Sequence, residues 1–355
     1  MTGVQTCALP IYIIIHIIHN LVLIHFWVII LKILIIRLSS IGDIFHTFTL
    51  LPDIKQKYPD AKIDWLVDES FKGIAELSPL IDNVITIPLR RWKKNKLSWL
   101  YNLFQFKQTL HSDKYDYIID TQGLIKSAFL AKLLFNGKIY GLDHNSARES
   151  LASWFYDYTY SISQKDVAVI RLRGLIAKIF NLNNDLYLIN FKVKSLCCNI
   201  RYSEEYVFYL HGTSKENKKW SLAAWCEFSE WIIQNTQLKI LLTYSNQSEL
   251  EFAQKFAEQM MNDRVIIIDQ LNFLQLVDLV QNAKLVVGVD TGFTHLANLL
   301  NKPTLAIYLH SDPSYVGMVE SKIAHNFGGY KSQVDPNILI DYIKTNNLLE
   351  LDNVK

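Results

Sequence analysis

The sequence predicts an α/β protein made of two parallel-sheet domains that face each other across a cleft. Short apolar runs alternate with amphipathic helical patterns from residue 32 almost to the end of the chain, which is typical of parallel strands joined by helical crossovers. Turns of small and polar residues follow a buried run in each half, at residues 39–47 and 290–295. Open α/β sheets bind ligands at the carboxyl ends of their strands, so we expect both turns to face one site.

Apolar runs bounded by polar residues predict the strands, and apolar residues at helical spacing predict the helices. In the first half, strands are predicted at 32–37, 62–67, 84–87, 115–120 and 138–141, and helices at 97–111, 124–135, 147–158 and 166–180. In the second half, strands are predicted at 206–210, 239–243, 265–268, 285–289 and 304–308, and helices at 223–235, 248–261, 273–282 and 293–300. A last amphipathic helix is predicted at about 337–347.

A polar, mixed stretch around residues 183–204 is the best place for a domain boundary. We therefore expect a first domain at 32–185, a linker at 186–204 and a second domain at 205–330. Residues 331–355 are expected to form a C-terminal helix that packs back on the first domain. With 355 residues, of which 50% are hydrophobic, the chain can supply two cores.

Charge and cysteine content narrow the classes of function. A net charge of +2 gives no whole-protein argument for binding nucleic acid. The cysteines form no C-x-x-C pair and no metal-ligand spacing with histidine; they are Cys7, Cys197, Cys198 and Cys226. These features predict a reduced, cytoplasmic protein.

The N-terminal extension, residues 1–31, contains no Asp, Glu, Lys or Arg, and residues 11–31 are nearly all apolar. That length suits one membrane span, and Lys32 and Arg37 behind it would keep the rest cytoplasmic. Three histidines and an asparagine weaken this interpretation, and no basic segment precedes the run, as a signal peptide requires. Two interpretations stay open: a membrane segment, or upstream sequence translated as an artefact.

Asp43 is the first candidate for chemistry. It lies in the turn at residues 39–47, between a predicted strand and a helical pattern. A carboxylate in this position can take a proton from an attacking hydroxyl. The alternative is a helix-capping aspartate, and spacing alone favours the cap.

Two turns of the second half suit a phosphate ligand. Residues 211–220 follow a predicted strand and offer the hydroxyls of Thr213 and Ser214 and the ammonium of Lys218. The turn at 290–295 leads a strand straight into a helix, whose free backbone N–H groups attract an anion. Each turn alone is compatible with an ordinary loop, but both end strands of one sheet, which favours a phosphate site.

A basic run in the first half suits an anionic acceptor. Residues 90–96 contain five cations in seven positions, after a predicted strand. They can bind phosphates, carboxylates or anionic lipid headgroups, although a solvated charge run is the ordinary alternative. Two further turns, at 120–127 and 147–150, add Lys126 and Arg148 as anion contacts unless these only flank helices.

Together these motifs resemble glycosyltransferase family 9, the heptosyltransferases of lipopolysaccharide synthesis. The resemblance covers nearly everything from residue 32 onward, with its marks at residues 39–47, 64–69, 90–92, 120–128, 147–149 and 290–295. The Asp-Thr-Gly-x-x-His turn at 290–295 marks the wider family. The Gly-Asp-x-x-His-Thr pattern at 42–47 and the Arg-Arg-Trp run at 90–92 are similar to the branch that adds the first heptose, heptosyltransferase I.

The resemblance implies a GT-B fold, in which two Rossmann-like domains face across a cleft, and an inverting transfer of heptose. It implies the donor ADP-L-glycero-β-D-manno-heptose and the acceptor Kdo-lipid A, with no metal or other cofactor. The expected protein is a monomer, peripheral on the cytoplasmic face of the bacterial inner membrane, without a nucleic-acid partner.

The resemblance also assigns roles to residues. Asp43 matches the general base that activates the Kdo hydroxyl. The second domain would bind the donor through Thr213, Ser214, Lys218, Glu249, Asp290, Thr291, Gly292 and His295. The first domain would bind the acceptor through Ser40, Gly42, His46, Arg90, Arg91, Lys94, Gln122, Lys126 and Arg148.

The sequence departs from the family pattern in three places. Residues 1–31 are additional, Phe48-Thr49 replace a usual proline, and Tyr244-Ser245 replace a Trp-Gly pair, which bears on nucleotide packing. Two rival interpretations stay open. One is an enzyme that adds a later heptose. The other is a non-catalytic sugar-nucleotide-binding protein, since two α/β lobes also bind ligands by hinge closure.

Overall fold

The computed structural model describes residues 30–94, 99–110, 114–189, 191, 193–194, 202–213 and 215–351, without the side chains of residues 93, 94, 99 and 100. Ser214 and the N-terminal extension up to residue 29 lie outside the described residues. Within the described ranges, no helix has both the length and the apolar character that crossing a membrane requires.

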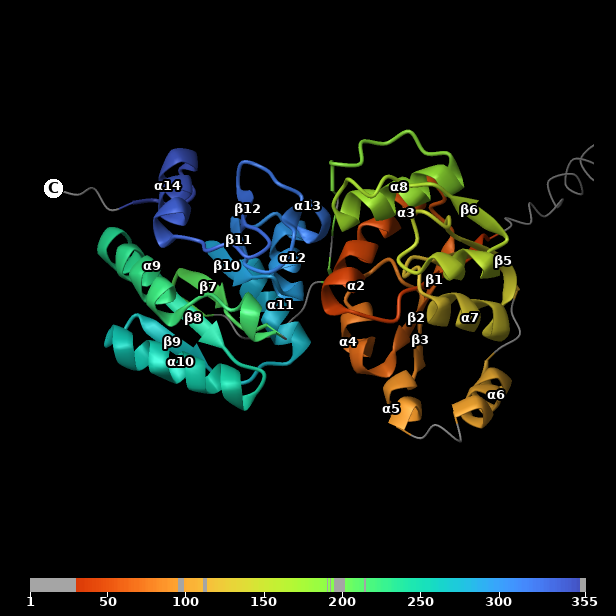
Figure 1. The fold of residues 1–355 in the computed structure, drawn as a ribbon, viewed down its shortest axis with the longest axis horizontal. Helices are drawn as coiled ribbons and strands as arrows, with labels where there is room; N and C mark the ends of the chain where they lie inside the picture. The colour runs from red at the N-terminus through yellow and green to blue at the C-terminus, as the bar shows by residue number, and fades with distance from the viewer. Residues whose placement is uncertain are drawn as a thin grey trace, which may run out of the picture.

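The first domain is a parallel six-stranded sheet in the order β3-β2-β1-β4-β5-β6 (Figure 1). Its strands are β1 (Lys32–Ile36), β2 (Lys62–Asp68), β3 (Asn83–Ile87), β4 (Lys114–Asp120), β5 (Asn136–Leu142) and β6 (Tyr158–Tyr160). Residues 33–36 of β1 are fully buried, because helices cover both faces of a parallel sheet and the strand is a continuous apolar run.

Helices of the first domain divide between the two faces of its sheet. Ile33 and Ile35 pack towards α2 (Ile41–Phe48), α3 (Leu50–Lys57), α4 (Lys72–Ala75) and α8 (Ala168–Phe180). Leu34 and Ile36 pack towards α6 (Trp99–Thr109) and α7 (Ile125–Leu134). The short helices η1 (Glu69–Phe71), α5 (Leu89–Lys94) and η2 (Ser150–Phe155) complete the domain.

The second domain repeats this architecture in the order β12-β11-β10-β7-β8-β9. Its strands are β7 (Tyr206–Leu210), β8 (Lys239–Thr243), β9 (Val265–Ile268), β10 (Leu285–Val289), β11 (Thr304–Tyr308) and β12 (Ala324–Gly328). Its helices are η3 (Glu216–Lys218), α9 (Leu222–Asn235), α10 (Gln247–Met260), α11 (Phe273–Asn282), α12 (Gly292–Leu299), α13 (Pro313–Val316) and α14 (Pro336–Asn346).

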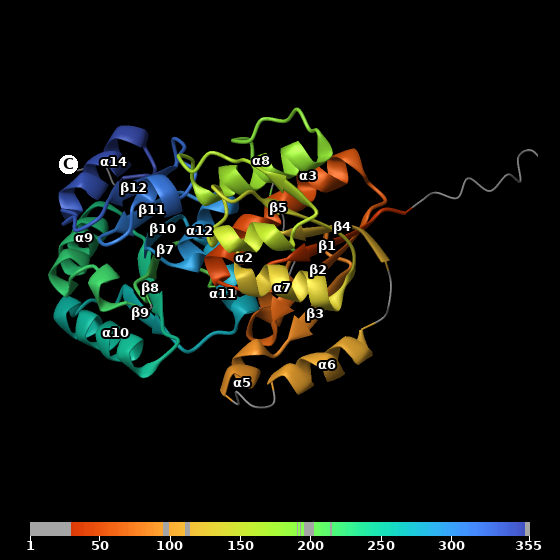
Figure 2. The ribbon, with the colours of Figure 1, turned by 45° about the vertical axis from the view of Figure 1, so that its right-hand side comes forward.

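The two domains meet through α2 and α12, which lie side by side in both ribbon views (Figures 1 and 2). The rings of Phe45 and Phe293 have centroids 5.7 Å apart, and both residues belong to one buried cluster that continues from domain to domain. A Cβ on Gly292 would lie 2.6 Å from the Ile41 side chain and 2.8 Å from the Gly42 backbone nitrogen. Glycine therefore allows the starts of the two helices to touch.

Every predicted strand is present with ends within a residue or two of those expected, but some elements differ. Two edge strands, β6 and β12, were not predicted. The helix expected at 147–158 is the short η2 followed by the start of β6, and the basic run begins as helix α5.

The predicted position of the C-terminal helix is wrong. α14 packs against α9 of the second domain, and its Leu339, Ile340 and Ile343 are buried in the second-domain core. Figure 1 shows α14 beside α9, on the side away from the first domain. An amphipathic pattern marks an apolar face but does not name the surface that covers it.

Candidate active site

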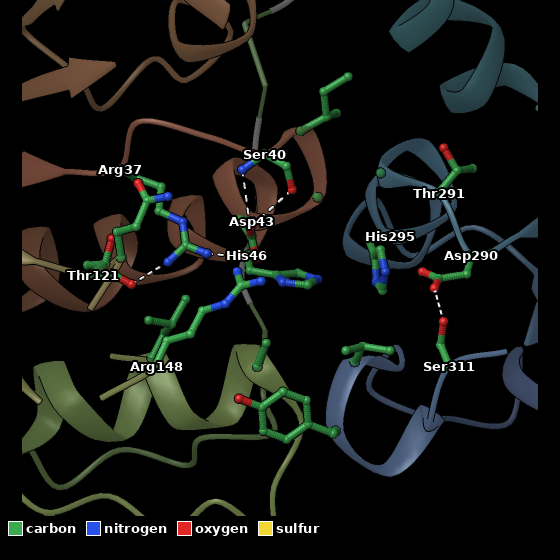
Figure 3. Close-up of a pocket in the computed structure, with 18 of the residues that line it drawn as sticks. Arg37, Ser40, Asp43, His46, Thr121, Arg148, Asp290, Thr291, His295 and Ser311 are labelled. Carbon is green, nitrogen blue, oxygen red and sulfur yellow. Dashed lines mark hydrogen bonds and ion pairs between the residues drawn. The ribbon is translucent and has the colours of Figure 1, made fainter. Parts of the chain in front are cut away.

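A cavity of about 680 Å³, which we call the interdomain cavity, lies between the two domains. The start of α2 and the turn after β4 border it from the first domain. The turn after β10 and the end of η3 border it from the second. Figure 3 shows Arg37, Asp43 and His46 on one side and Asp290, Thr291 and His295 on the other. The cavity thus lies where the carboxyl ends of both sheets face each other.

Asp43 is the third residue of α2 and borders the interdomain cavity. Its Oδ2 accepts hydrogen bonds from the backbone N–H of Ser40 at 3.1 Å and from the Ser40 hydroxyl at 3.0 Å. Burial by itself would raise the pKa of Asp43. The Arg37 guanidinium and the Ser40 hydrogen bonds outweigh burial and lower that pKa below its ordinary value. The same ionised carboxylate therefore caps the helix and borders the cavity.

Arg37 is a site residue that the sequence analysis missed. Its guanidinium lies 2.6 Å from Oδ1 of Asp43 and also donates to the backbone carbonyl of Thr121 (Figure 3). The side chain is almost fully buried, so it links the turn after β4 to the start of α2. The signal was available, because Arg37 directly follows the central strand at the same sheet edge as Asp43.

His46 and His295 meet across the domain contact, with ring centroids 4.5 Å apart and the rings edge to face. Burial, more than any other factor, lowers the pKa of both imidazoles, and for His46 the neighbouring His295 lowers it further. Among the described residues, neither ring nitrogen of His46 has a hydrogen-bond partner. Both rings therefore border the cavity as neutral groups.

Asp290 organises the second-domain side of the cavity. Its carboxylate pairs with the Lys218 ammonium. It also accepts a hydrogen bond from the Ser311 hydroxyl (Figure 3). The Thr213 hydroxyl lies 3.5 Å from the Asp290 carbonyl oxygen. The structure brings six of the predicted donor residues together at the cavity: Thr213, Lys218, Asp290, Thr291, Gly292 and His295. Ser311 was not predicted, although it follows β11 at the same sheet edge.

Of the predicted donor residues that the structure describes, Glu249 is the one that does not border the interdomain cavity. It lies in the first turn of α10, where its Oε2 accepts hydrogen bonds from the Ser245 backbone N–H at 2.7 Å and hydroxyl at 2.8 Å. Its carboxylate packs so closely on Gly212 that a side chain there would collide with it. The structure therefore places Glu249 beside the turn after β7, outside the cavity.

The predicted acceptor residues separate into four groups. Those that border the interdomain cavity are Ser40, Gly42, His46, Arg90, Gln122 and Arg148. Arg91 does not border it and instead pairs with Glu69 at 2.6 Å. Lys126 borders a second cavity on the first domain. Lys94 belongs to α5, but its side chain lies outside the described residues.

Asp120 fixes the turn that carries Gln122. Its buried carboxylate accepts hydrogen bonds from the Ser127 hydroxyl at 2.7 Å, the Tyr156 hydroxyl at 2.8 Å and the Gln122 backbone N–H at 2.9 Å. Burial raises the pKa of Asp120, although these hydrogen bonds act in the opposite direction. Gln122 in turn accepts a hydrogen bond from the Leu38 backbone N–H at 2.8 Å. The turn after β4 is therefore held in register with the segment before Asp43.

His, Cys, Asp and Glu side chains can bind a metal ion only where they lie close enough together. In the described part of the chain, no group of three or more of these side chains comes together in a way that could hold a metal ion.

Two parallel-sheet domains that face each other across a cavity, at the carboxyl ends of their strands, are an architecture of the GT-B type. A family model described as glycosyltransferase family 9 (heptosyltransferase) matches residues 103–337. The chain belongs to this family, the heptosyltransferases.

Named relatives and solved structures agree with this assignment. Lipopolysaccharide heptosyltransferase 1 of Salmonella typhimurium is 33% identical, over 81% of this chain and 91% of the relative. The solved structure of E. coli heptosyltransferase WaaC with ADP is 30% identical in sequence to this chain and superposes with a TM-score of 0.77. The match covers 89% of this chain and 100% of the WaaC chain. The structure of WaaC with ADP-2-deoxy-2-fluoro heptose covers the same shares with a TM-score of 0.76. The predicted fold class and family are confirmed.

Proposed function

We propose that the protein transfers L-glycero-D-manno-heptose from ADP-heptose to the Kdo sugar of Kdo-lipid A, in synthesis of the lipopolysaccharide inner core. The single observation that carries this proposal is the position of Asp43. Its ionised carboxylate borders the interdomain cavity from the first domain, while Lys218, Thr291 and Gly292 border it from the second. A base and a phosphate site on opposite walls are what an inverting sugar transfer needs.

The second domain is the proposed donor domain. Lys218 and the backbone N–H groups at the start of α12 can stabilise the negative charge that develops on the leaving diphosphate. Lys218 is paired with Asp290, so a bound diphosphate would share this ammonium. The WaaC structures with ADP and with ADP-2-deoxy-2-fluoro heptose support a donor of this chemistry.

In the proposed reaction, a Kdo hydroxyl oxygen attacks the anomeric carbon of the donor from the face opposite the diphosphate. The new carbon–oxygen bond forms as the bond to the phosphate oxygen breaks, and ADP leaves. Asp43 accepts the hydroxyl proton. Because Arg37 and the Ser40 hydrogen bonds hold the pKa of Asp43 below its ordinary value, the carboxylate is ionised near neutral pH.

The first domain is the proposed acceptor domain. Arg90 and Arg148 border the cavity and suit the carboxylate and phosphates of a glycolipid acceptor. The Salmonella relative is named heptosyltransferase 1, which supports transfer of the first heptose. We also propose that the protein acts as a monomer at the cytoplasmic face of the inner membrane, without a metal.

The test is ADP release from ADP-heptose by the purified full chain, with and without Kdo-lipid A. Asp43→Asn should abolish acceptor-dependent release while donor binding, measured by calorimetry, is retained. Asp60→Asn changes an exposed aspartate of the same domain and should leave release unchanged.

Two results would redirect the proposal. If ADP is released only with an acceptor that already carries one heptose, the protein adds a later heptose. Donor binding without release on either acceptor would favour a non-catalytic binding protein.

A further inference from the structure

A second cavity, of about 860 Å³, lies on the first domain and has no part in the proposed chemistry. It is bordered by α5, α6 and α7, and Figure 1 shows α5 and α6 set apart from α7 on this side of the sheet. We call it the apolar groove, after the side chains that line most of it: Leu89, Trp92, Leu103, Ile125, Phe129 and Leu130.

The carboxylates at the margin of the apolar groove are already paired within the protein. Asp68 accepts hydrogen bonds from the Ser70 backbone N–H at 3.1 Å and from the Ser70 hydroxyl. Glu149 accepts a hydrogen bond from the Ile125 backbone N–H at 2.7 Å. What the groove presents to a ligand is therefore mainly hydrocarbon and aromatic surface, which suits an apolar ligand.

The apolar groove lies next to the interdomain cavity, and the two share Arg90 as a lining residue. Leu38 and Ser39 border the groove, and the next residue, Ser40, borders the interdomain cavity and donates to Asp43. A ligand that reaches from one cavity to the other would therefore pass Arg90 and the segment just before Asp43.

Arg90 places a positive charge at this junction. Its guanidinium lies 4.8 Å from the centre of the Phe71 ring and has Nε 3.9 Å from Oδ1 of Asp68. The side chain is nevertheless 65% exposed, so its N–H groups can bind a further anion. Arg90 thus lies between the interdomain cavity on one side and the apolar groove on the other.

We propose that the apolar groove holds an acyl chain of the acceptor, with Arg90 paired to an anionic group between that chain and the reacting sugar. A glycolipid carries its sugar, anionic groups and hydrocarbon in this same order, so one molecule can occupy both cavities. The inference rests on the proposed function, since it requires a lipid acceptor. It adds that the protein recognises hydrocarbon as well as sugar.

The test compares Kdo-lipid A with the same acceptor after complete deacylation, both in one detergent at fixed concentration. Ile125→Asp puts a charge into the groove at the first position of α7, where an aspartate is compatible with the helix. KM for the acylated acceptor should rise about tenfold, the expected order for losing one apolar contact of this size. The kcat, and the KM values for deacylated acceptor and for ADP-heptose, should not change.

Ile338→Asp is the matched control, because Ile338 is an exposed isoleucine in the first turn of α14, away from the groove. It should leave all these constants unchanged. In a second arm, an acceptor analogue with a photoreactive acyl chain should label peptides of α5, α6 or α7 in the wild type and less in Ile125→Asp.

Three results would overturn the inference. Equal KM changes with both acceptors would show that the groove does not distinguish acyl chains. If Ile125→Asp also binds acceptor-free anionic vesicles more weakly, by the same factor as its KM rises, the groove contacts the lipid bilayer rather than an acyl chain of the acceptor. Label outside the groove would place the chain elsewhere. Absence of turnover by the wild type with both acceptors would instead refute the proposed function, and the labelling would still decide where the chain binds.

Discussion

The guanidinium of Arg37 lies 2.6 Å from the carboxylate of Asp43, and its other end donates to the Thr121 carbonyl. Two turns from different strands are thereby joined at the proposed base. The charge of Arg37 also holds the carboxylate in its ionised form. Arg37 therefore sets both the position and the basicity of Asp43.

Replacing Arg37 with Met should move the acid limb of kcat/KM to higher pH. The Arg37 guanidinium lowers the pKa of Asp43, whereas burial raises it. Removing the guanidinium should therefore raise the pKa of Asp43. A larger fraction of the base is then protonated at mildly acidic pH. Arg37→Lys keeps a cation and should shift the limb less.

The measurement is the pH profile of acceptor-dependent ADP release. Arg171→Met removes another cation that borders the cavity but donates to the Ser146 carbonyl instead. An equal shift in both Met variants would show a general effect of charge rather than the Arg37–Asp43 contact.

The contact between His46 and His295 should make the protein less stable in mild acid. Burial lowers the pKa of His46 in the folded protein, so the unfolded chain binds more protons once the pH falls below about 6.5, the ordinary value. The free energy of unfolding should therefore decrease as pH falls from there towards the folded pKa. Denaturant unfolding at pH 7.5 and 5.5 measures this slope.

His46→Phe keeps an aromatic ring in the contact and cannot take up a proton, so it should flatten the pH dependence. His144→Phe changes an exposed histidine of the same domain and should leave the slope as in the wild type. A His46→Phe protein with the full wild-type slope would assign the effect to other groups.

Gly292→Ala should impair catalysis more than folding. The added Cβ would lie 2.8 Å from the Gly42 nitrogen and 2.6 Å from Ile41, so the starts of α2 and α12 must separate. A displacement of about 1 Å between reacting groups can reduce kcat on the order of a hundredfold. ADP-release kinetics and thermal unfolding measure the two effects.

Gly73→Ala is the control, because a Cβ there would meet only the Phe273 ring at 3.9 Å. It should keep near-wild-type turnover. Normal kcat in Gly292→Ala would mean that the contact of the two helix starts is not needed for the reaction.

Arg173→Met should destabilise the first domain by about 3–5 kcal/mol, because it leaves a buried carboxylate unpaired. Arg173 binds both oxygens of Asp53 at 2.7 and 2.8 Å and joins α8 to α3, and both side chains are almost fully buried. Denaturant unfolding followed by tryptophan fluorescence gives the free energy.

Lys72→Met breaks an ion pair with Glu76 in which both side chains are about half exposed. It should cost less than about 1 kcal/mol. The double change Asp53→Leu with Arg173→Met removes both buried charges and should recover much of the loss. A double variant as unstable as Arg173→Met would show that packing, rather than the unpaired charge, is responsible.

The inner strands and the turns after them were predictable because buried parallel strands are continuous apolar runs. β12 was missed because His325 and Asn326 interrupt its pattern at the sheet edge, and β6 because it is only three residues long. Asp43, Asp290 and His295 follow strands at the carboxyl edges of two different sheets, and they border one cavity because α2 and α12 bring those two edges together.

Contacts between remote elements were not predictable from local pattern. Its place directly after the central strand puts Arg37 at the ligand-binding edge of the sheet, but no local pattern indicates that it pairs with Asp43 and Thr121. The apolar face of α14 does not indicate which domain it packs against. In the folded protein it packs against α9 of the second domain. Glu249 follows the turn after β8, yet its carboxylate is taken up by Ser245, which sequence spacing does not show.

The touching helix starts at Gly42 and Gly292 have a mechanical consequence. They form a pivot close to Asp43 and His295, while the apolar groove lies farther out on the first domain, between α5, α6 and α7. A rotation of one domain about this pivot would displace the distant rims most and the reacting groups least. Such a rotation would let the proposed glycolipid acceptor enter and leave with little change in the alignment of the proposed base and the proposed donor site.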